Sequence, residues 1–158
     1  MSLGLVLLRA FGIGLVTGLR SFTGVALVCW AAHLGWLDLE GSRLVFMGST
    51  LATYGFSALA LGELIADKLP FIGKRTSPGP LFGRIVLGAL SGAALGVAAG
   101  SPPAAGAILG GAGGVTGAFA GYRTRAFLVK TSGGPDWVIA LLEDLVAVGG
   151  GFLLVARF

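Results

Sequence analysis

Charged side chains are scarce in this sequence. Only 11% of the 158 residues are Asp, Glu, Lys or Arg, whereas 55% are hydrophobic and 29 residues are glycine. A soluble domain usually has about a quarter of its residues charged, because folding leaves a large surface for water to cover. This shortage of charge excludes a soluble globular domain. It predicts an integral membrane protein that forms one domain over residues 1–158.

Cysteine and cofactor motifs are also lacking. The single cysteine, Cys29, lies in an apolar run, which excludes a disulfide framework and a cysteine-based metal site. The segment 73–76, Gly-Lys-Arg-Thr, lacks the first glycine of a phosphate-binding loop and lies between two apolar segments. We therefore expect no metal and no other cofactor. The question of enzymatic activity stays open, because Glu63 and Asp67 are only a thin version of a metal-binding acid cluster.

The hydrophobic residues are grouped into five stretches. A bilayer core of about 30 Å requires roughly 20 residues of helix. Four segments have this length: Leu44–Ala66, Leu81–Gly100, Pro103–Tyr122 and Trp137–Ala156. The first stretch, Leu3–Leu37, is too long for one span, and residues 18–24 interrupt it with a charge, two hydroxyls and two glycines. We predict an all-α, polytopic transmembrane bundle whose first stretch is broken near Arg20, either as a kinked helix or as two half-helices.

Basic residues predict how the chain is oriented. The net charge is +4, but the basic side chains are not gathered on a soluble face, so we expect no nucleic-acid partner. They lie mainly in the segments 68–84 and 123–130, which fall on one side if the two spans between them form a hairpin. The positive-inside rule places both segments, predicted as loops, in the cytoplasm. The N-terminus is then also inside if the first stretch crosses once, and outside if that stretch is re-entrant.

Glycine recurs at helical spacing in the middle of the chain. Such rows let helices approach closely in a membrane, where lipid is as apolar as the side chains. The rows are Gly88, Gly92, Gly96 and Gly100; Gly106, Gly110 and Gly114; and Gly113, Gly117 and Gly121. We predict a glycine-zipper hairpin of the third and fourth spans. Two rows on the fourth span can serve two neighbours, so a subunit interface is the alternative. A bundle this small rarely encloses a pathway alone, which predicts a homo-oligomer, with a dimer as the first expectation.

Ionisable residues within the apolar segments are the candidate functional residues, because charges in a bilayer are costly and face a bundle interior or a water cavity. The candidates for binding a solute or ion are Arg20, Ser21, Glu63, Asp67, Lys68, Arg84, Arg123, Asp136, Glu143 and Asp144. In one interpretation they line a polar cavity whose carboxylates take up a proton or a cation. In the other they form structural salt bridges, for instance between Arg20 and Glu143.

Short motifs carry a resemblance to a known family. They are Gly18-Leu19-Arg20-Ser21, Glu63-Leu64-Ile65-Ala66-Asp67-Lys68-Leu69-Pro70, Gly83-Arg84, Pro135-Asp136 and Glu143-Asp144. From about Gly12 to Val148 the chain resembles the DUF4126 family of small bacterial membrane proteins. The resemblance implies a multi-pass protein of the bacterial inner membrane and supplies no substrate or catalytic role.

These patterns favour a small oligomeric channel or secondary transporter for a small ion or polar solute. Glu63, Glu143 and Asp144 are its predicted proton- or cation-responsive acids, and Arg20 is their counter-charge or an anion contact. The alternative is a non-transporting protein, which binds lipid or serves as an accessory subunit of a larger membrane complex. Membrane lipids are expected partners in either case.

Overall fold

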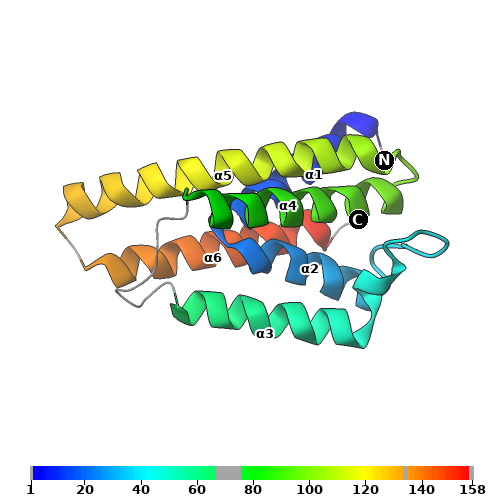
Figure 1. Cartoon of the computed structure of the whole chain (residues 1–158), viewed down its shortest axis with the longest axis horizontal. Coiled ribbons are helices and arrows are strands. Elements are labelled where there is room, and N and C mark those ends of the chain that lie inside the picture. Colours follow the sequence, from blue (N-terminus) through cyan, green and yellow to red (C-terminus); the bar gives the residue numbers. More distant parts are fainter. Residues whose placement is uncertain (1, 67–75, 134, 157–158) are drawn as a thin grey trace.

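The computed structural model describes residues 2–66, 76–133 and 135–156, and these residues form a bundle of helices (Figure 1). The elements are α1 Leu3–Leu19, α2 Ser21–His33, the 3-10 helix η1 Val45–Gly48, α3 Thr50–Ala66, α4 Pro78–Ala98, α5 Pro103–Ser132 and α6 Asp136–Val155. All regular secondary structure in this described part is helical, as the sequence predicted.

Three helices are long and apolar enough to cross a membrane, namely α4, α5 and α6. The described parts of α1, α2 and α3 are apolar but shorter than a full span. The predicted segment Leu44–Ala66 is helical in α3 only from Thr50 onwards. Ser49 starts α3, because its backbone is extended and its hydroxyl accepts a hydrogen bond from the N–H of Ala52 at 3.2 Å.

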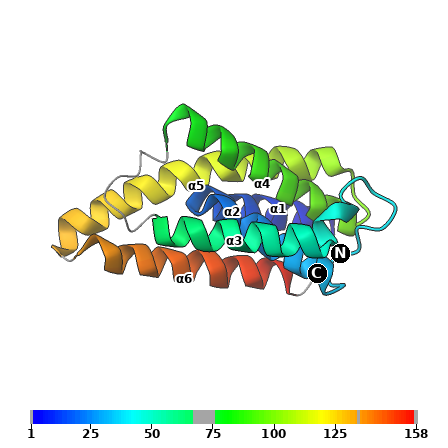
Figure 2. The same ribbon diagram turned by 60° about the horizontal axis from the view of Figure 1, so that its bottom comes forward.

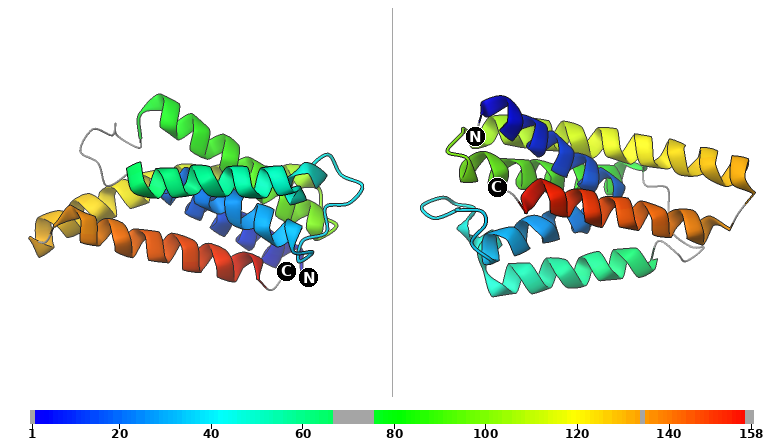
Figure 3. Two further views of the ribbon diagram at one scale, coloured as in Figure 1. Left: turned by 90° about the horizontal axis from the view of Figure 1, so that it is seen from below. Right: turned by 180° about the vertical axis from the view of Figure 1, so that it is seen from behind.

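The first hydrophobic stretch consists of two half-helices that turn back on each other. α1 runs from the N-terminal end of the bundle to its middle, and α2 returns from there toward the same end (Figures 1 and 3). The two half-helices are so close that a Cβ atom on Gly24 would overlap the side-chain oxygen of Thr17. The N-terminus therefore lies at the same end of the bundle as the loop that follows α2. Of the two arrangements that the sequence left open, this is the re-entrant one.

α5 packs tightly between α4 and α1. A Cβ atom on Gly92 of α4 would overlap the carbonyl oxygen of Gly106, and one on Gly113 of α5 would overlap the carbonyl oxygen of Phe11 in α1. The glycines whose Cβ would overlap the backbone of a neighbouring helix are Gly14, Gly18, Gly88, Gly92, Gly106, Gly110, Gly113, Gly114 and Gly117. Both glycine rows of α5 thus face helices of the same chain.

The predicted basic loop 123–130 is instead helical. α5 continues to Ser132 because nothing between Tyr122 and that residue breaks the helix, and it ends at Gly133, whose φ of +62° suits a left-handed C-terminal residue. The start of the other predicted loop, 67–75, lies outside the described residues, and its last part belongs to α4. Figure 2 shows α5 and α6 meeting at one end of the bundle and diverging along their length.

Large apolar side chains cover much of the outer surface. Leu51 of α3 is 86% exposed, and Ile108 of α5 and Leu145 of α6 are exposed to a similar degree. Exposure of this kind on several helices is unfavourable in water, and it fits a surface that faces lipid. The fold therefore buries polar side chains such as Arg20 and Arg84 within its apolar core, while many large apolar side chains remain on its outer surface.

Candidate functional site

The site is built around the break between α1 and α2. Arg20 is the single residue between the two helices, and its backbone is extended, with φ −137° and ψ 109°. A break of this kind leaves the last carbonyls of α1 and the first N–H groups of α2 without partners inside their own helices. Side chains from other helices supply some of these partners.

Glu63 of α3 holds the start of α2. Its Oε1 accepts a hydrogen bond from the backbone N–H of Ser21 at 2.7 Å, and its Oε2 accepts one from the N–H of Phe22 at 2.9 Å. The N-terminus of a helix carries a partial positive charge and free N–H donors, so a carboxylate is the best-matched group for this position. Glu63 therefore occupies an anion-binding position.

Arg84 of α4 holds the end of α1. Its Nε donates to the carbonyl oxygen of Gly18 at 3.0 Å, and its Nη1 donates to that of Pro80 in its own helix at 3.3 Å. Its Nη2 lies 3.6 Å from Oε1 of Glu63, and the side chain is only 4% exposed. A guanidinium matches the negative C-terminal end of a helix in the same way that a carboxylate matches the N-terminal end.

The side chain of Arg20 points to α6 and is fully buried. Its Nε donates to Oδ1 of Asp144 at 2.7 Å, and its Nη2 lies 2.5 Å from the same oxygen. The Nη2 also lies 3.6 Å from Oε2 of Glu143 and donates to the carbonyl oxygen of Ala140 at 3.4 Å. Charge-assisted hydrogen bonds of this length are the strong ones, and the low dielectric of the interior strengthens them further.

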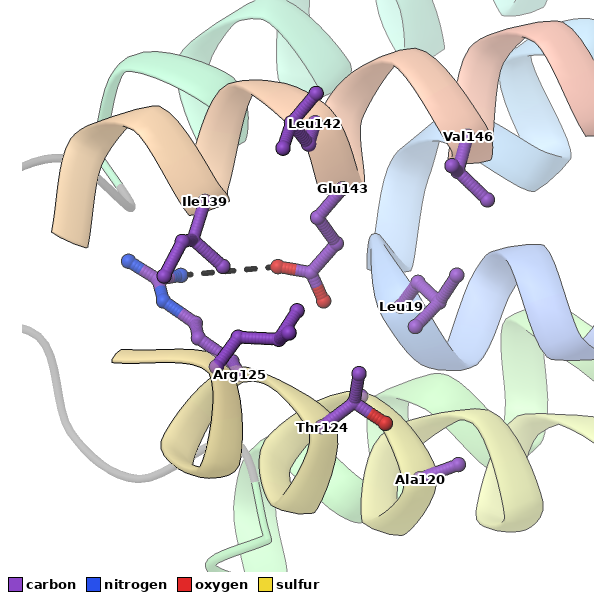
Figure 4. Close-up of a pocket in the computed structure, with 10 residues that line it drawn as sticks. Leu19, Ala120, Thr124, Arg125, Ile139, Leu142, Glu143 and Val146 are labelled. Atoms are coloured by element: carbon purple, nitrogen blue, oxygen red, sulfur yellow. Dashed lines mark ion pairs between the residues drawn. The ribbon is translucent and has the colours of Figure 1, made fainter. Parts of the chain in front are cut away.

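Arg125 of α5 extends the charged cluster toward the α5–α6 turn. Its Nε donates to Oδ1 of Asp136 at 2.8 Å and its Nη2 donates to Oδ2 at 2.5 Å, which is the two-pronged geometry that guanidinium and carboxylate prefer. Its Nη1 lies 3.7 Å from Oε2 of Glu143, as the dashed line in Figure 4 shows. Glu143 is thus shared between two arginines, Arg20 and Arg125.

The structure joins most of the predicted residues into one constellation. Ser21, Glu63 and Arg84 meet on the α3–α4 side of the break, and Arg20 meets the α6 acids on the other side. The two charged clusters of the sequence therefore lie on the two sides of the same break within one chain. Asp67 and Lys68 lie outside the described residues.

The sequence analysis did not single out Arg125 on α5. Arg123 is exposed and makes no ion pair with any described residue, whereas Arg125 pairs with Asp136 and Glu143. A signal for this was present, because Arg125 continues the helical row of Gly113, Gly117 and Gly121 that faces α1.

The comparisons with known proteins place the chain in a family. A family model described as "Domain of unknown function (DUF4126)" matches residues 7–157, nearly the whole chain. The chain belongs to the DUF4126 family. This confirms the resemblance carried by the short motifs. No curated protein and no solved structure matches the sequence.

The charge balance defines what this DUF4126 site can do. Three arginines face four carboxylates among the described residues, so the seven groups carry a formal charge of −1 when all are ionised. No group of three His, Cys, Asp or Glu side chains in the described part of the chain is placed to hold a metal ion. Loss of the charge on one side chain would leave its buried partner without compensation. Such a loss would therefore have to be matched by a proton or another small charged group.

Proposed function

We propose that this DUF4126 protein is a membrane carrier for a small ion or polar solute, with its site at the break between α1 and α2. The observation that supports this most directly is the contact of the Glu63 carboxylate with the first two N–H groups of α2. Many carriers bind their solutes where helices are interrupted at mid-membrane, because the half-helix ends offer free donors and acceptors.

In this mechanism Glu63 acts as a replaceable anion. Uptake of a proton removes its charge, and the start of α2 then loses the carboxylate that it holds at 2.7 and 2.9 Å. The vacated helix N-terminus and the guanidinium of Arg84 together fit a small anionic group. The α1–α2 hairpin is then free to shift against α3 and α4 and to open the site to the other side.

The acids of α6 serve a second role in the proposal. Asp144 and Glu143 hold Arg20, and Arg20 fixes the point about which the two half-helices turn. A change of protonation at either acid alters how firmly that point is held. We therefore assign proton or cation sensitivity to Glu143 and Asp144 as well as to Glu63.

Flux into vesicles tests the proposal. Purified protein is reconstituted into liposomes that contain a pH-sensitive dye, and proton entry is followed with and without an imposed membrane potential. We expect proton entry to be faster with the wild-type protein than into empty vesicles. In Glu63→Gln this protein-dependent rate should be at least tenfold lower, equivalent to about 1.4 kcal/mol. The glutamine keeps the shape and one acceptor oxygen but cannot release a proton.

Glu40→Gln is the matched control. Glu40 is an exposed acid in the loop after α2, so the same chemical change there should leave flux unaltered. Flux of wild-type size in Glu63→Gln, with the variant correctly folded, would contradict the assigned role of Glu63.

The internal pairing of the charges favours a second candidate. Glu63, Asp136, Glu143 and Asp144 each face an arginine, as a purely structural network requires. In that case the protein is a lipid-binding or accessory subunit of a larger membrane complex. Glu63→Gln then lowers stability or assembly, and the wild-type vesicles show no flux above empty ones.

The cellular setting belongs to the same proposal. We place the protein in the bacterial inner membrane, with the turn between α5 and α6 in the cytoplasm because Arg123 and Lys130 lie at that end. We also propose that it acts as a homo-oligomer, a dimer first, since a bundle of this size has little room to enclose a pathway. The contact must use a face other than the glycine rows of α5, which α4 and α1 already cover.

A further inference from the structure

A pocket of about 260 Å³ lies between α5 and α6, beside the end of α1. The two helices meet at their turn and diverge from there, and the pocket occupies the space between them (Figures 2 and 4). Its lining residues are Leu19, Ala120, Gly121, Thr124, Arg125, Leu128, Ile139, Leu142, Glu143 and Val146. The pocket is partly open to the outside of the bundle.

The pocket is apolar along its length and charged at one end. Most of its lining side chains are aliphatic, and the two charged ones are Glu143 and Arg125. Figure 4 shows the guanidinium of Arg125 at the side of the pocket toward the start of α6, and Glu143 reaching toward it. Glu143 lies between the guanidinium groups of Arg20 and Arg125, and Arg125 also pairs with Asp136, so an added anion must take the place of a carboxylate on Arg125.

A second recess of about 360 Å³ continues from Arg125 toward the α5–α6 turn. It is lined by Tyr122, Arg125, Ala126, Val129, Lys130 and Asp136. Arg125 lines both spaces, and Lys130 adds a second cation to the outer one. Asp136, which now holds Arg125, has a side chain that is 58% exposed, so it can turn to water when another anion takes its place.

We propose that the two spaces together bind one anionic membrane phospholipid. An acyl chain lies in the apolar pocket, and the phosphate replaces Asp136 on Arg125 and is shared with Lys130. The two-pronged donor geometry of a guanidinium fits a phosphate as well as it fits a carboxylate. Free phosphate gains nothing from the apolar pocket, and a neutral or zwitterionic lipid gains less from the two cations. This lipid site stands apart from the proposed carrier function and does not require flux.

Site-specific quenching tests the proposal. The single cysteine is replaced by Cys29→Ala, a cysteine is introduced by Leu142→Cys at the edge of the pocket, and a fluorophore is attached to it. The protein is reconstituted in unlabelled phosphatidylcholine, to which one nitroxide-labelled lipid is added. This lipid is either phosphatidylglycerol or phosphatidylcholine, with the nitroxide on its acyl chain in both cases. We expect half-quenching at about fivefold lower content of the anionic lipid, as about 1 kcal/mol from a basic side chain predicts.

Three further variants separate the site from general attraction to the surface. A fluorophore on Leu153→Cys, at an exposed position on the same helix outside the pocket, should be quenched equally by both lipids. Arg125→Gln should remove the fivefold preference at Leu142→Cys. Arg123→Gln removes the same charge from an exposed position two residues away and should keep the preference.

Ala120→Phe fills the pocket without changing any charge and should also remove the preference, which covers the case in which Arg125→Gln does not fold. Thermal unfolding followed by circular dichroism identifies the folded variants. Equal quenching by both lipids at Leu142→Cys would overturn the proposal. So would a loss in Arg123→Gln as large as that in Arg125→Gln, or a preference that survives Ala120→Phe.

Discussion

Arg84 and Glu63 approach to 3.6 Å across a broken helix, and each holds a different end of the break. Arg84 donates to the carbonyl of Gly18 at the end of α1, and Glu63 accepts from the N–H groups that begin α2. The signs of the two side chains match the partial charges of the two helix ends. The break is therefore stabilised by α3 and α4, which links the α1–α2 hairpin to the rest of the bundle.

Loss of the Arg20 side chain should be strongly destabilising. Arg20→Met removes the guanidinium that pairs with the buried Asp144 and that shares Glu143 with Arg125, and breaking a buried ion pair costs about 3–5 kcal/mol. The free energy of unfolding in detergent, from denaturant titration, measures the loss. The double variant Arg20→Met with Asp144→Leu should recover part of it, and a double variant no more stable than the single one would show that the two side chains do not act as a pair.

Two carboxylates that bind arginine in similar ways should differ in importance. Asp136→Asn affects a pair whose carboxylate is 58% exposed, so its cost should stay below about 1 kcal/mol and shrink with added salt. Asp144→Asn affects the buried pair of Arg20 and should cost several times more, with little effect of salt. Equal losses in the two variants, measured by thermal unfolding at low and high salt, would contradict the burial difference.

Two glycines that both lie inside helices should respond oppositely to alanine. Gly92→Ala drives a methyl group into the backbone of α5 at Gly106 and should cost about 1–3 kcal/mol. Gly55→Ala places the methyl group in open space on α3 and should be neutral or stabilising by up to about 1 kcal/mol, because alanine favours the helix. The melting temperatures of both variants are compared with that of the wild-type protein in the same detergent. An unchanged melting temperature in Gly92→Ala would contradict the close approach of α4 and α5.

The α1–α2 hairpin predicts which residues share a side of the membrane. In a Cys29→Ala background, cysteines introduced by Ser2→Cys and Asp38→Cys should react with a membrane-impermeant thiol reagent from one side. One introduced by Thr131→Cys, at the end of α5, should react only from the other. Labelling of Ser2→Cys and Asp38→Cys from opposite sides would mean that the first stretch crosses the membrane once.

Much of the fold follows from the sequence. Apolar segments of this length, together with glycines at helical spacing, leave few other ways to arrange the helices. The starts of α4, α5 and α6 lie within three residues of the starts of the predicted segments, because each helix begins at a proline or directly after one. The break near Arg20 was also predicted, but whether the chain crosses or turns back depends on the packing of Gly24 on Thr17, which spacing alone does not determine.

The site was predicted as a set of residues rather than as a set of pairs. Burial of charge in an apolar segment is visible in the sequence and identifies Arg20, Glu63, Glu143 and Asp144. The pairing depends on tertiary structure. The expected Arg20–Glu143 ion pair is present at 3.6 Å, but the shortest contacts of Arg20 are with Asp144, which spacing does not predict. The role of Glu63 at backbone N–H groups could not be predicted, because it requires the position of α3 beside the break.

Amide hydrogen exchange at Ser21 and Phe22 tests the central claim most directly. The protein is reconstituted in vesicles, and exchange at these two amides is compared with and without the proton gradient that drives flux. If transport requires Glu63 to release the start of α2, the amides of Ser21 and Phe22 should exchange faster under the gradient. The exchange rates of amides in the middle of α5 should stay the same. Flux accompanied by unaltered protection at Ser21 and Phe22 would contradict the account.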